Sequence, residues 1–187
     1  MPTSAAGSRG VRRGAARGFT LIELLVTLVV AAMLSGLVAL ALPGGHDESA
    51  RIEAQRLAAL LDTAREQAAA FGMPVAWAAG PAGYTFLRPT ARGWMPIDQA
   101  PLVARAWSWM GGSVAADYQP RSDASSWSSG GVRISVTGGG ALGAPSGWLV
   151  FGAEPVSQPM RVQIDTDTQR LTVASNGAQP FQLQQQR

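Results

Sequence analysis

The 187-residue sequence contains no cysteine and only one histidine, His46. The absence of cysteine excludes a disulfide framework, a thiolate nucleophile and a lipoprotein anchor. A single histidine removes most catalytic dyads and zinc sites, because these sites combine histidine with a nucleophile or with further ligands. Any catalysis would therefore depend on carboxylates, serines and arginines, and we expect no enzymatic activity, no catalytic residues and no cofactor.

Acidic residues are absent from residues 1–18, a leader that carries four arginines: Arg9, Arg12, Arg13 and Arg17. The formal net charge of the whole chain is +3, but the part after the leader is slightly acidic. Protein binding to phosphates requires basic residues on the folded part of the protein. We therefore do not expect nucleic acid as a partner.

Charge is also scarce in residues 19–42, an apolar run in which Glu23 is the sole charged residue. As a helix this run is about 36 Å long, which is enough to cross a hydrocarbon layer of about 30 Å. Arginines precede the run and acidic residues follow it, so the N-terminus is predicted to lie in the cytoplasm and the rest of the chain to be exported. Small residues recur at four-residue spacing, as they do where helices pack closely: Ala31, Ser35 and Ala39.

The position of Glu23 inside the apolar run calls for a reason, since a charge at bilayer depth costs on the order of 3 kcal/mol. The segment Arg-Gly-Phe-Thr-Leu-Ile-Glu at residues 17–23 resembles the class III signal of type IV pilins and type II secretion pseudopilins. The resemblance implies that a prepilin peptidase removes residues 1–18 by cutting between Gly18 and Phe19, and that Phe19 is then N-methylated. It also implies that Glu23 pairs with the amino terminus of a neighbouring subunit's Phe19 during assembly, so that each group neutralises the other.

Residues 43–71 are predicted to continue as an amphipathic helix after an interruption at Pro43-Gly44-Gly45. Apolar side chains recur there at spacings of three and four residues, which is typical of a helix face that packs on a sheet. We call this face the apolar stripe, and its members are Leu57, Leu60, Leu61, Ala64, Ala68 and Phe71. Gly72 and Pro74 are predicted to end the helix.

Residues 72–187 are predicted to form a periplasmic, β-rich domain, because short β-like runs alternate with turn residues. PVAWAA and YTFLR indicate one hairpin, MRVQI and RLTVAS a second, and VARAWSW, VRISVT and GWLVFG further strands. Residues 111–131 are rich in Gly, Ser and Asp, and are predicted to be a long surface loop. Together with the N-terminal helix, these features predict an α+β, pilin-like fold.

Three further patterns resemble binding sites, but structural roles are favoured for all three. The glycines at 138–143 fit a dinucleotide fingerprint, but Pro145 and a strand follow where a helix would be needed, so a loop is favoured. Asp165 and Asp167 lack the further oxygen ligands that calcium requires, so a hairpin turn is favoured. Most of the six tryptophans are expected in the core or at subunit contacts, and Trp127 on the surface.

Residues 54–77, AQRLAALLDTAREQAAAFGMPVAW, are followed by GYTFLR and a Trp-containing strand, and later by FGAEPVSQPMRVQI and RLTV. This pattern resembles the minor pseudopilin H family of type II secretion systems over most of the chain, with its specific part in the first third. The resemblance implies a structural subunit at or near the tip of a periplasmic pseudopilus that promotes export of folded proteins. Its implied partners are other major and minor pseudopilins, the prepilin peptidase, the inner-membrane assembly platform, and secreted cargo or the outer-membrane secretin. Two alternatives stay open: a minor pilin of a type IV pilus, with a role in assembly priming or DNA uptake, and a single-pass membrane enzyme or receptor with a signal anchor.

Overall fold

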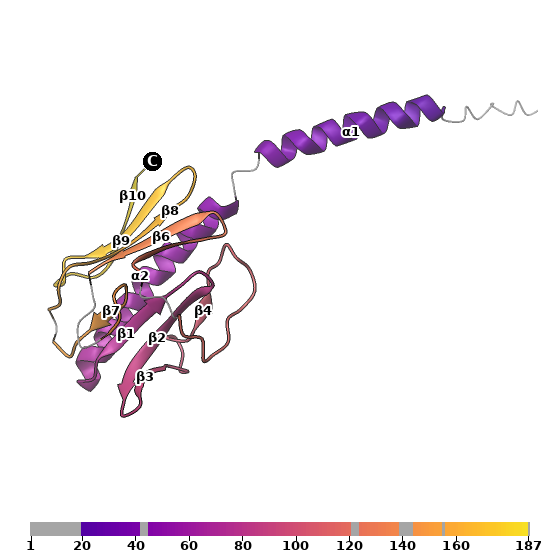
Figure 1. The fold of residues 1–187 in the computed structure, drawn as a ribbon. Coiled ribbons are helices and arrows are strands. Elements are labelled where there is room, and N and C mark those ends of the chain that lie inside the picture. The colour runs from indigo at the N-terminus through magenta and orange to yellow at the C-terminus, as the bar shows by residue number, and fades with distance from the viewer. Residues whose placement is uncertain (1–19, 42–44, 121–123, 139–143, 155, 187) are drawn as a thin grey trace, which may run out of the picture. The chain divides into compact units, whose positions relative to one another are not determined.

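The computed structural model describes residues 20–41, 45–120, 124–138, 144–154 and 156–186. The chain divides into two units, residues 1–43 and residues 44–187. The first unit contains one helix, α1 (Leu21–Ala41), and the second contains a longer helix, α2 (Gly45–Phe71), followed by the strands (Figure 1). None of the helices in the described ranges is both long and apolar enough to cross a membrane. The predicted span at 19–42 extends beyond these ranges and stays a prediction.

Helix α2 begins at Gly45, the last residue of the predicted interruption. Its first turn contains Asp47 and Glu48, and acidic residues there interact favourably with the helix dipole. The helix ends at Phe71, where Gly72 adopts a positive φ of 62°. A left-handed glycine directly after the last turn is a common helix terminator, because glycine has no Cβ to clash in that conformation.

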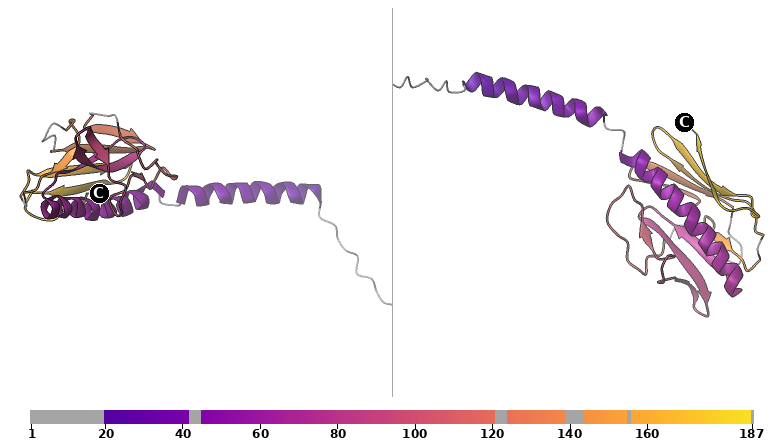
Figure 2. Two further views of the ribbon diagram at one scale, coloured as in Figure 1. Left: turned by 90° about the horizontal axis from the view of Figure 1, so that it is seen from below. Right: turned by 180° about the vertical axis from the view of Figure 1, so that it is seen from behind.

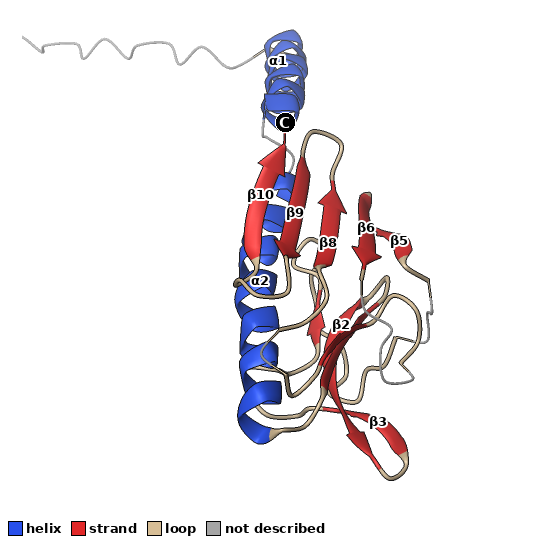
Figure 3. Ribbon diagram, turned by 90° about the vertical axis from the view of Figure 1, so that its left-hand side faces the viewer, coloured by secondary structure: helices blue, strands red, loops and turns tan. Residues whose placement is uncertain are grey.

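Two antiparallel five-stranded sheets follow α2. The first has the order β3-β2-β1-β7, with β4 also paired to β2. Its strands are β1 (Val75–Ala79), β2 (Gly83–Thr90), β3 (Gly93–Pro96), β4 (Arg105–Ala106) and β7 (Leu149–Phe151). The second has the order β10-β9-β8-β6-β5 (Figure 3). Its strands are β5 (Ser126–Ser129), β6 (Val132–Thr137), β8 (Met160–Asp165), β9 (Arg170–Ser175) and β10 (Gln182–Gln186).

Helix α2 lies across one face of both sheets (Figure 2). The main core is formed by buried residues of α2 and of both sheets. Strands β6 and β8, and residues 170–173 of β9, alternate buried apolar residues with more exposed polar ones, as expected when only one face of a sheet is covered. Strand β1 is buried on both faces, because a second cluster containing Trp148 and Val150 covers its other side. This arrangement confirms the predicted α+β fold.

The apolar stripe is confirmed at five of its six predicted positions, since Leu57, Leu60, Leu61, Ala64 and Ala68 are all buried. The prediction that Phe71 belongs to the buried stripe is wrong. Its side chain is 73% exposed, because it is the last residue of α2 and the chain turns away at Gly72.

The predicted surface loop at 111–131 is also corrected in part. Residues 126–129 within it form strand β5, which pairs with β6 across a turn at Gly130 and Gly131. Trp127, expected on the surface, is half-buried and packs against the core. Conversely, the strand predicted in VARAWSW is reduced to two residues, Arg105 and Ala106.

Candidate assembly site

The start of α1 is capped by Thr20, and this cap positions Glu23 in the first helical turn. The backbone N–H of Glu23 donates hydrogen bonds to the carbonyl oxygen of Thr20 at 3.1 Å and to its hydroxyl at 3.3 Å. Thr20 and Glu23 thus have the spacing of a capping box, in which a Ser or Thr cap is followed three residues later by Glu. The carboxylate is therefore held near the helix terminus, where the helix dipole favours negative charge.

The residues of α1 from Leu21 to Met33 are exposed, although most are apolar. An exposed apolar surface of this extent is typical of a protein or membrane contact. Thr27, one turn after Glu23, donates its hydroxyl to the carbonyl of Leu24 at 2.9 Å. The hydroxyl of Thr27 is therefore already satisfied within the helix, and the carboxylate of Glu23 is the charged group of this surface.

The other predicted site residues are placed only in part. Gly18 and Phe19 lie outside the described residues, so the cleavage and N-methylation site stays a prediction. Ala31 lies on the exposed surface of α1. Ser35 and Ala39 lie in the same helix, but their side chains are outside the described part, and the packing role of these three residues stays a prediction.

A buried carboxylate holds α2 to the first sheet at a position that the sequence analysis missed. Glu53 is 0% exposed, and its Oε1 accepts a hydrogen bond of 2.6 Å from the hydroxyl of Tyr84 in β2. Its Oε2 accepts a 2.7 Å bond from Arg56. Burial, and then the charge of Glu53, raise the pKa of Tyr84, so its hydroxyl stays protonated and remains a donor. The sequence offers only a partial signal, because Glu53 lies four residues before Leu57, on the helix face that carries the apolar stripe, whereas its partner Tyr84 is 31 residues away.

A second carboxylate, Asp47, ties the first turn of α2 to the β8–β9 turn of the second sheet. Its two carboxylate oxygens accept hydrogen bonds from the hydroxyls of Thr166 and Thr168. The side chain of Gln169 also donates to the backbone carbonyl of Asp47, at 2.7 Å. The bonds from Thr166 and Thr168 hold the pKa of Asp47 below its ordinary value.

We predict that Asp47→Asn loosens this contact by about 1 kcal/mol at neutral pH, the usual net value of one hydrogen bond. Because the folded pKa is lowered, the carboxylate stabilises the fold above its ordinary pKa of 3.8. That stabilisation is lost as the pH falls through the lowered folded pKa, which is below this value. Asp47→Asn should therefore show a weaker loss of stability below about pH 4 than the unsubstituted chain, as measured by urea unfolding across a pH series.

Asp167→Asn is the matched control, because Asp167 lies in the same turn but is exposed. Its unfolding curve should follow that of the unsubstituted chain at each pH. Equal effects of the two substitutions would contradict the role assigned to Asp47.

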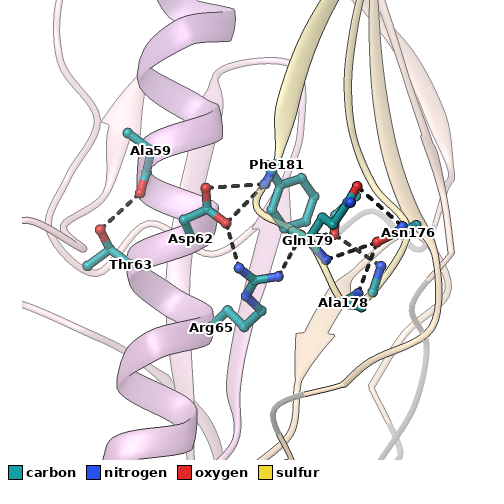
Figure 4. A network of polar contacts seen from close by, with 10 residues as sticks. Ala59, Asp62, Thr63, Arg65, Asn176, Ala178, Gln179 and Phe181 are labelled. Carbon is teal, nitrogen blue, oxygen red and sulfur yellow. Dashed lines mark hydrogen bonds and ion pairs between the residues drawn. The ribbon is translucent and has the colours of Figure 1, made fainter.

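A third contact fixes α2 to the β9–β10 turn (Figure 4). The carboxylate of Asp62 accepts hydrogen bonds from the backbone N–H of Phe181 at 3.0 and 3.2 Å, and forms an ion pair with Arg65 at 3.2 Å. Arg65 in turn donates to the carbonyl of Gln179 at 2.7 Å. Phe181 is buried, so this contact positions the start of β10 and one of the core aromatics together.

The aspartates and tryptophans that were not assigned to binding sites from the sequence have structural roles in the fold. Asp165 ends β8, forms an ion pair with Arg170 at 2.8 Å and accepts hydrogen bonds from Gln163. This confirms the predicted hairpin turn. Four tryptophans are buried, as expected: Trp77, Trp107, Trp109 and Trp148. Of the glycine-rich run, residues 139–143 lie outside the described part.

Comparison with known proteins gives two family matches. A family described as the prokaryotic N-terminal methylation motif matches residues 13–39, and a family described as type II transport protein GspH matches residues 53–177. The solved structure of the minor pseudopilin EpsH from the type 2 secretion system of Vibrio cholerae is similar, with 17% sequence identity and a TM-score of 0.48. That similarity covers 73% of this chain and 96% of EpsH. A comparison with curated proteins gave no match. Since the GspH family covers more than half of the sequence, the chain belongs to the GspH family of type II transport proteins.

Proposed function

We propose that the chain is a minor pseudopilin anchored in the bacterial inner membrane by residues 19–42, with its N-terminus in the cytoplasm. After removal of residues 1–18 and methylation of Phe19, it joins a periplasmic pseudopilus at or near the tip. There it promotes the export of folded proteins across the outer membrane. Its partners are other major and minor pseudopilins, the prepilin peptidase and the inner-membrane assembly platform, with secreted cargo or the secretin met at the outer end.

The observation that carries this proposal is the start of α1. A methylation motif matches residues 13–39, and within it Glu23 lies on an otherwise apolar, exposed helix surface. A carboxylate in such surroundings is favourable only with a partner charge. The amino terminus of a neighbouring subunit, freed by cleavage before Phe19, supplies that charge in the proposed assembly.

In the second unit, three carboxylates connect α2 to the sheets. Its carboxylates Asp47, Glu53 and Asp62 are engaged in joining α2 to the sheets. These contacts join α2 to both sheets, which suits a subunit that must keep its shape when it is packed into a filament.

The proposal is tested by deleting the coding sequence in the host and restoring the full chain. We expect the deletion strain to accumulate folded secretion substrates in the periplasm, and the restored strain to release them into the medium. Normal release by the deletion strain would contradict the proposal. Normal release together with loss of surface pili would instead assign the chain to a type IV pilus.

A further inference from the structure

A cavity of about 320 Å³ lies beside α2, where the chain passes from β4 into the following loop. Arg56 of α2 and Arg105 of β4 both line it, together with Ser108, whose hydroxyl donates to the backbone carbonyl of Ser49 at 2.8 Å, and Ser113. We call it the arginine cavity. The contacts derived above do not use it, except that Arg56 is the ion-pair partner of Glu53.

Arg105 differs from every other described arginine in its surroundings. Its residue is half-buried, and its Nε is buried without a hydrogen-bond partner. Arg51, Arg56, Arg65 and Arg170 each form an ion pair with a carboxylate. The remaining described arginines form no such pair but are exposed to water: Arg88, Arg92, Arg133 and Arg161.

The carboxylate of Glu53 accepts hydrogen bonds from Tyr84 and Arg56, and within the described residues it forms no ion pair with Arg105. The group formed by Arg56, Arg105 and Glu53 therefore carries one positive charge in excess. A guanidinium that is partly withdrawn from water without a partner is costly, since the desolvation of its N–H groups is not repaid. Such an unsatisfied group in a folded protein calls for an explanation.

Two exposed glycines also line the cavity and add no side chain to it. Gly111 and Gly112 line the cavity with positive φ values of 66° and 80°, a conformation that glycine adopts without strain. A Cβ atom built on either residue would meet no atom within 4 Å. The space beside this backbone is therefore not filled by the protein itself.

We propose that the arginine cavity binds a carboxylate, and that this carboxylate belongs to an Asp or Glu side chain of a neighbouring pseudopilin. Guanidinium and carboxylate groups match in geometry and charge, and can form two parallel hydrogen bonds. The volume lies at the lower end of the range for small-molecule sites, about 300–1,000 Å³, which suits one inserted side chain. The identity of the partner rests on the proposed function, whereas the carboxylate chemistry does not.

The carboxylate chemistry is tested on the full chain in detergent, with arginine labelled with ¹⁵N and acetate as the probe. We expect the Nε–Hε resonance of Arg105, identified by its absence from Arg105→Met, to shift saturably with acetate and not with chloride at equal ionic strength. Arg105→Met should be at least as stable to urea as the unsubstituted chain, because it removes an unsatisfied buried group. No saturable shift, or the same shift with chloride, would overturn the site.

The partner is tested by recovering other pseudopilins from host membranes with the tagged full chain. We expect Arg105→Glu to lower their recovery at least tenfold, Arg105→Lys to retain part of it, and the control Arg92→Glu to leave it unchanged. Acetate binding with undiminished recovery from Arg105→Glu would make the cavity a site for small free anions and overturn the partner assignment. If the unsubstituted chain recovers no pseudopilins, the partner assignment and the proposed function both fail, while the acetate titration still decides the carboxylate site.

Discussion

Replacing Glu53 with alanine is expected to destabilise the second unit by about 3–5 kcal/mol, the usual cost of breaking a buried ion pair by removing one partner. The substitution leaves the hydroxyl of Tyr84 buried without its acceptor, and it frees Arg56 from its ion pair. It also opens a cavity within the apolar stripe, because Glu53 is fully buried. Urea unfolding of the full chain in detergent, followed by tryptophan fluorescence, measures this loss. Trp77 and Trp107 report on the site directly, since both rings pack near Tyr84.

Glu48→Ala is the matched control. Glu48 lies on the same helix and also pairs with an arginine three residues later, at the same distance of 2.7 Å. Its side chain is 62% exposed, whereas that of Glu53 is 0% exposed. Surface ion pairs contribute little to stability, so Glu48→Ala should leave the unfolding midpoint almost unchanged. Equal losses from Glu48→Ala and Glu53→Ala would contradict the role assigned to burial.

A double-mutant cycle with Tyr84→Phe separates the hydrogen bond from the packing. Tyr84→Phe alone should cost about 1–3 kcal/mol, because it leaves a buried carboxylate oxygen without a donor. Combined with Glu53→Ala, it should cost less than the sum of the two single effects, since the unsatisfied partner is then absent. Strict additivity would indicate that the two groups do not interact.

Replacing Glu23 with glutamine is expected to abolish recovery of other pseudopilins with the full chain, while leaving membrane insertion and removal of residues 1–18 intact. Glutamine keeps the shape of the side chain and the backbone hydrogen bond to Thr20, so α1 should begin unchanged. It removes the negative charge that the proposed pairing with a neighbouring Phe19 requires. Affinity capture from membranes, with mass spectrometry of the captured subunits, measures both association and processing.

Thr27→Val is the control for this substitution. Thr27 lies one turn from Glu23 on the same helix, and its hydroxyl already bonds to the carbonyl of Leu24. Valine has nearly the same shape, so association should persist at the level of the unsubstituted chain. Normal association of Glu23→Gln would contradict the assembly role, and loss of association in both variants would indicate a general sensitivity of α1.

Much of the fold follows from the sequence because its strongest patterns are local. The apolar stripe and the alternation in VRISVT, MRVQI and RLTVAS identify α2, β6, β8 and β9 from side-chain spacing alone. Phe71 was assigned to the core because the helical period continues through it. Its exposure depends on where the chain turns after α2, and periodicity carries no information about that turn.

Strands β5 and β10 were missed because their own residues carry little strand signal, and pairing with a neighbouring strand supplies the rest. Strand β5 lies in a Ser-rich segment with little β-propensity, and it forms because β6 follows directly after a two-glycine turn. Strand β10 consists mainly of glutamine and pairs with β9 from a start fixed by Asp62. In VARAWSW the residues Trp107 and Trp109 bury their rings instead of continuing a strand, with their indole N–H groups donating to Gly80 and Ser129.

The functional and structural side chains also differ in how far the sequence alone could identify them. Glu23 could be identified from the sequence because a charge within an apolar run is conspicuous at any distance from its partner. Glu53, Asp47 and Arg105 could not be assigned roles, because their significance lies in Tyr84, in the β8–β9 turn and in a cavity wall. The fold, and not the local sequence, brings Glu53 to Tyr84, Asp47 to the β8–β9 turn, and Arg105 to the cavity that Arg56 also lines.

The central claim, that this member of the GspH family matures and assembles as a pseudopilin, is tested most directly by the mass of the mature chain. The full chain is expressed in its host, extracted from membranes and analysed by intact-mass and N-terminal mass spectrometry. The account predicts a chain that begins at Phe19 with a methylated amino group. A membrane-extracted chain that still begins at Met1 would contradict it.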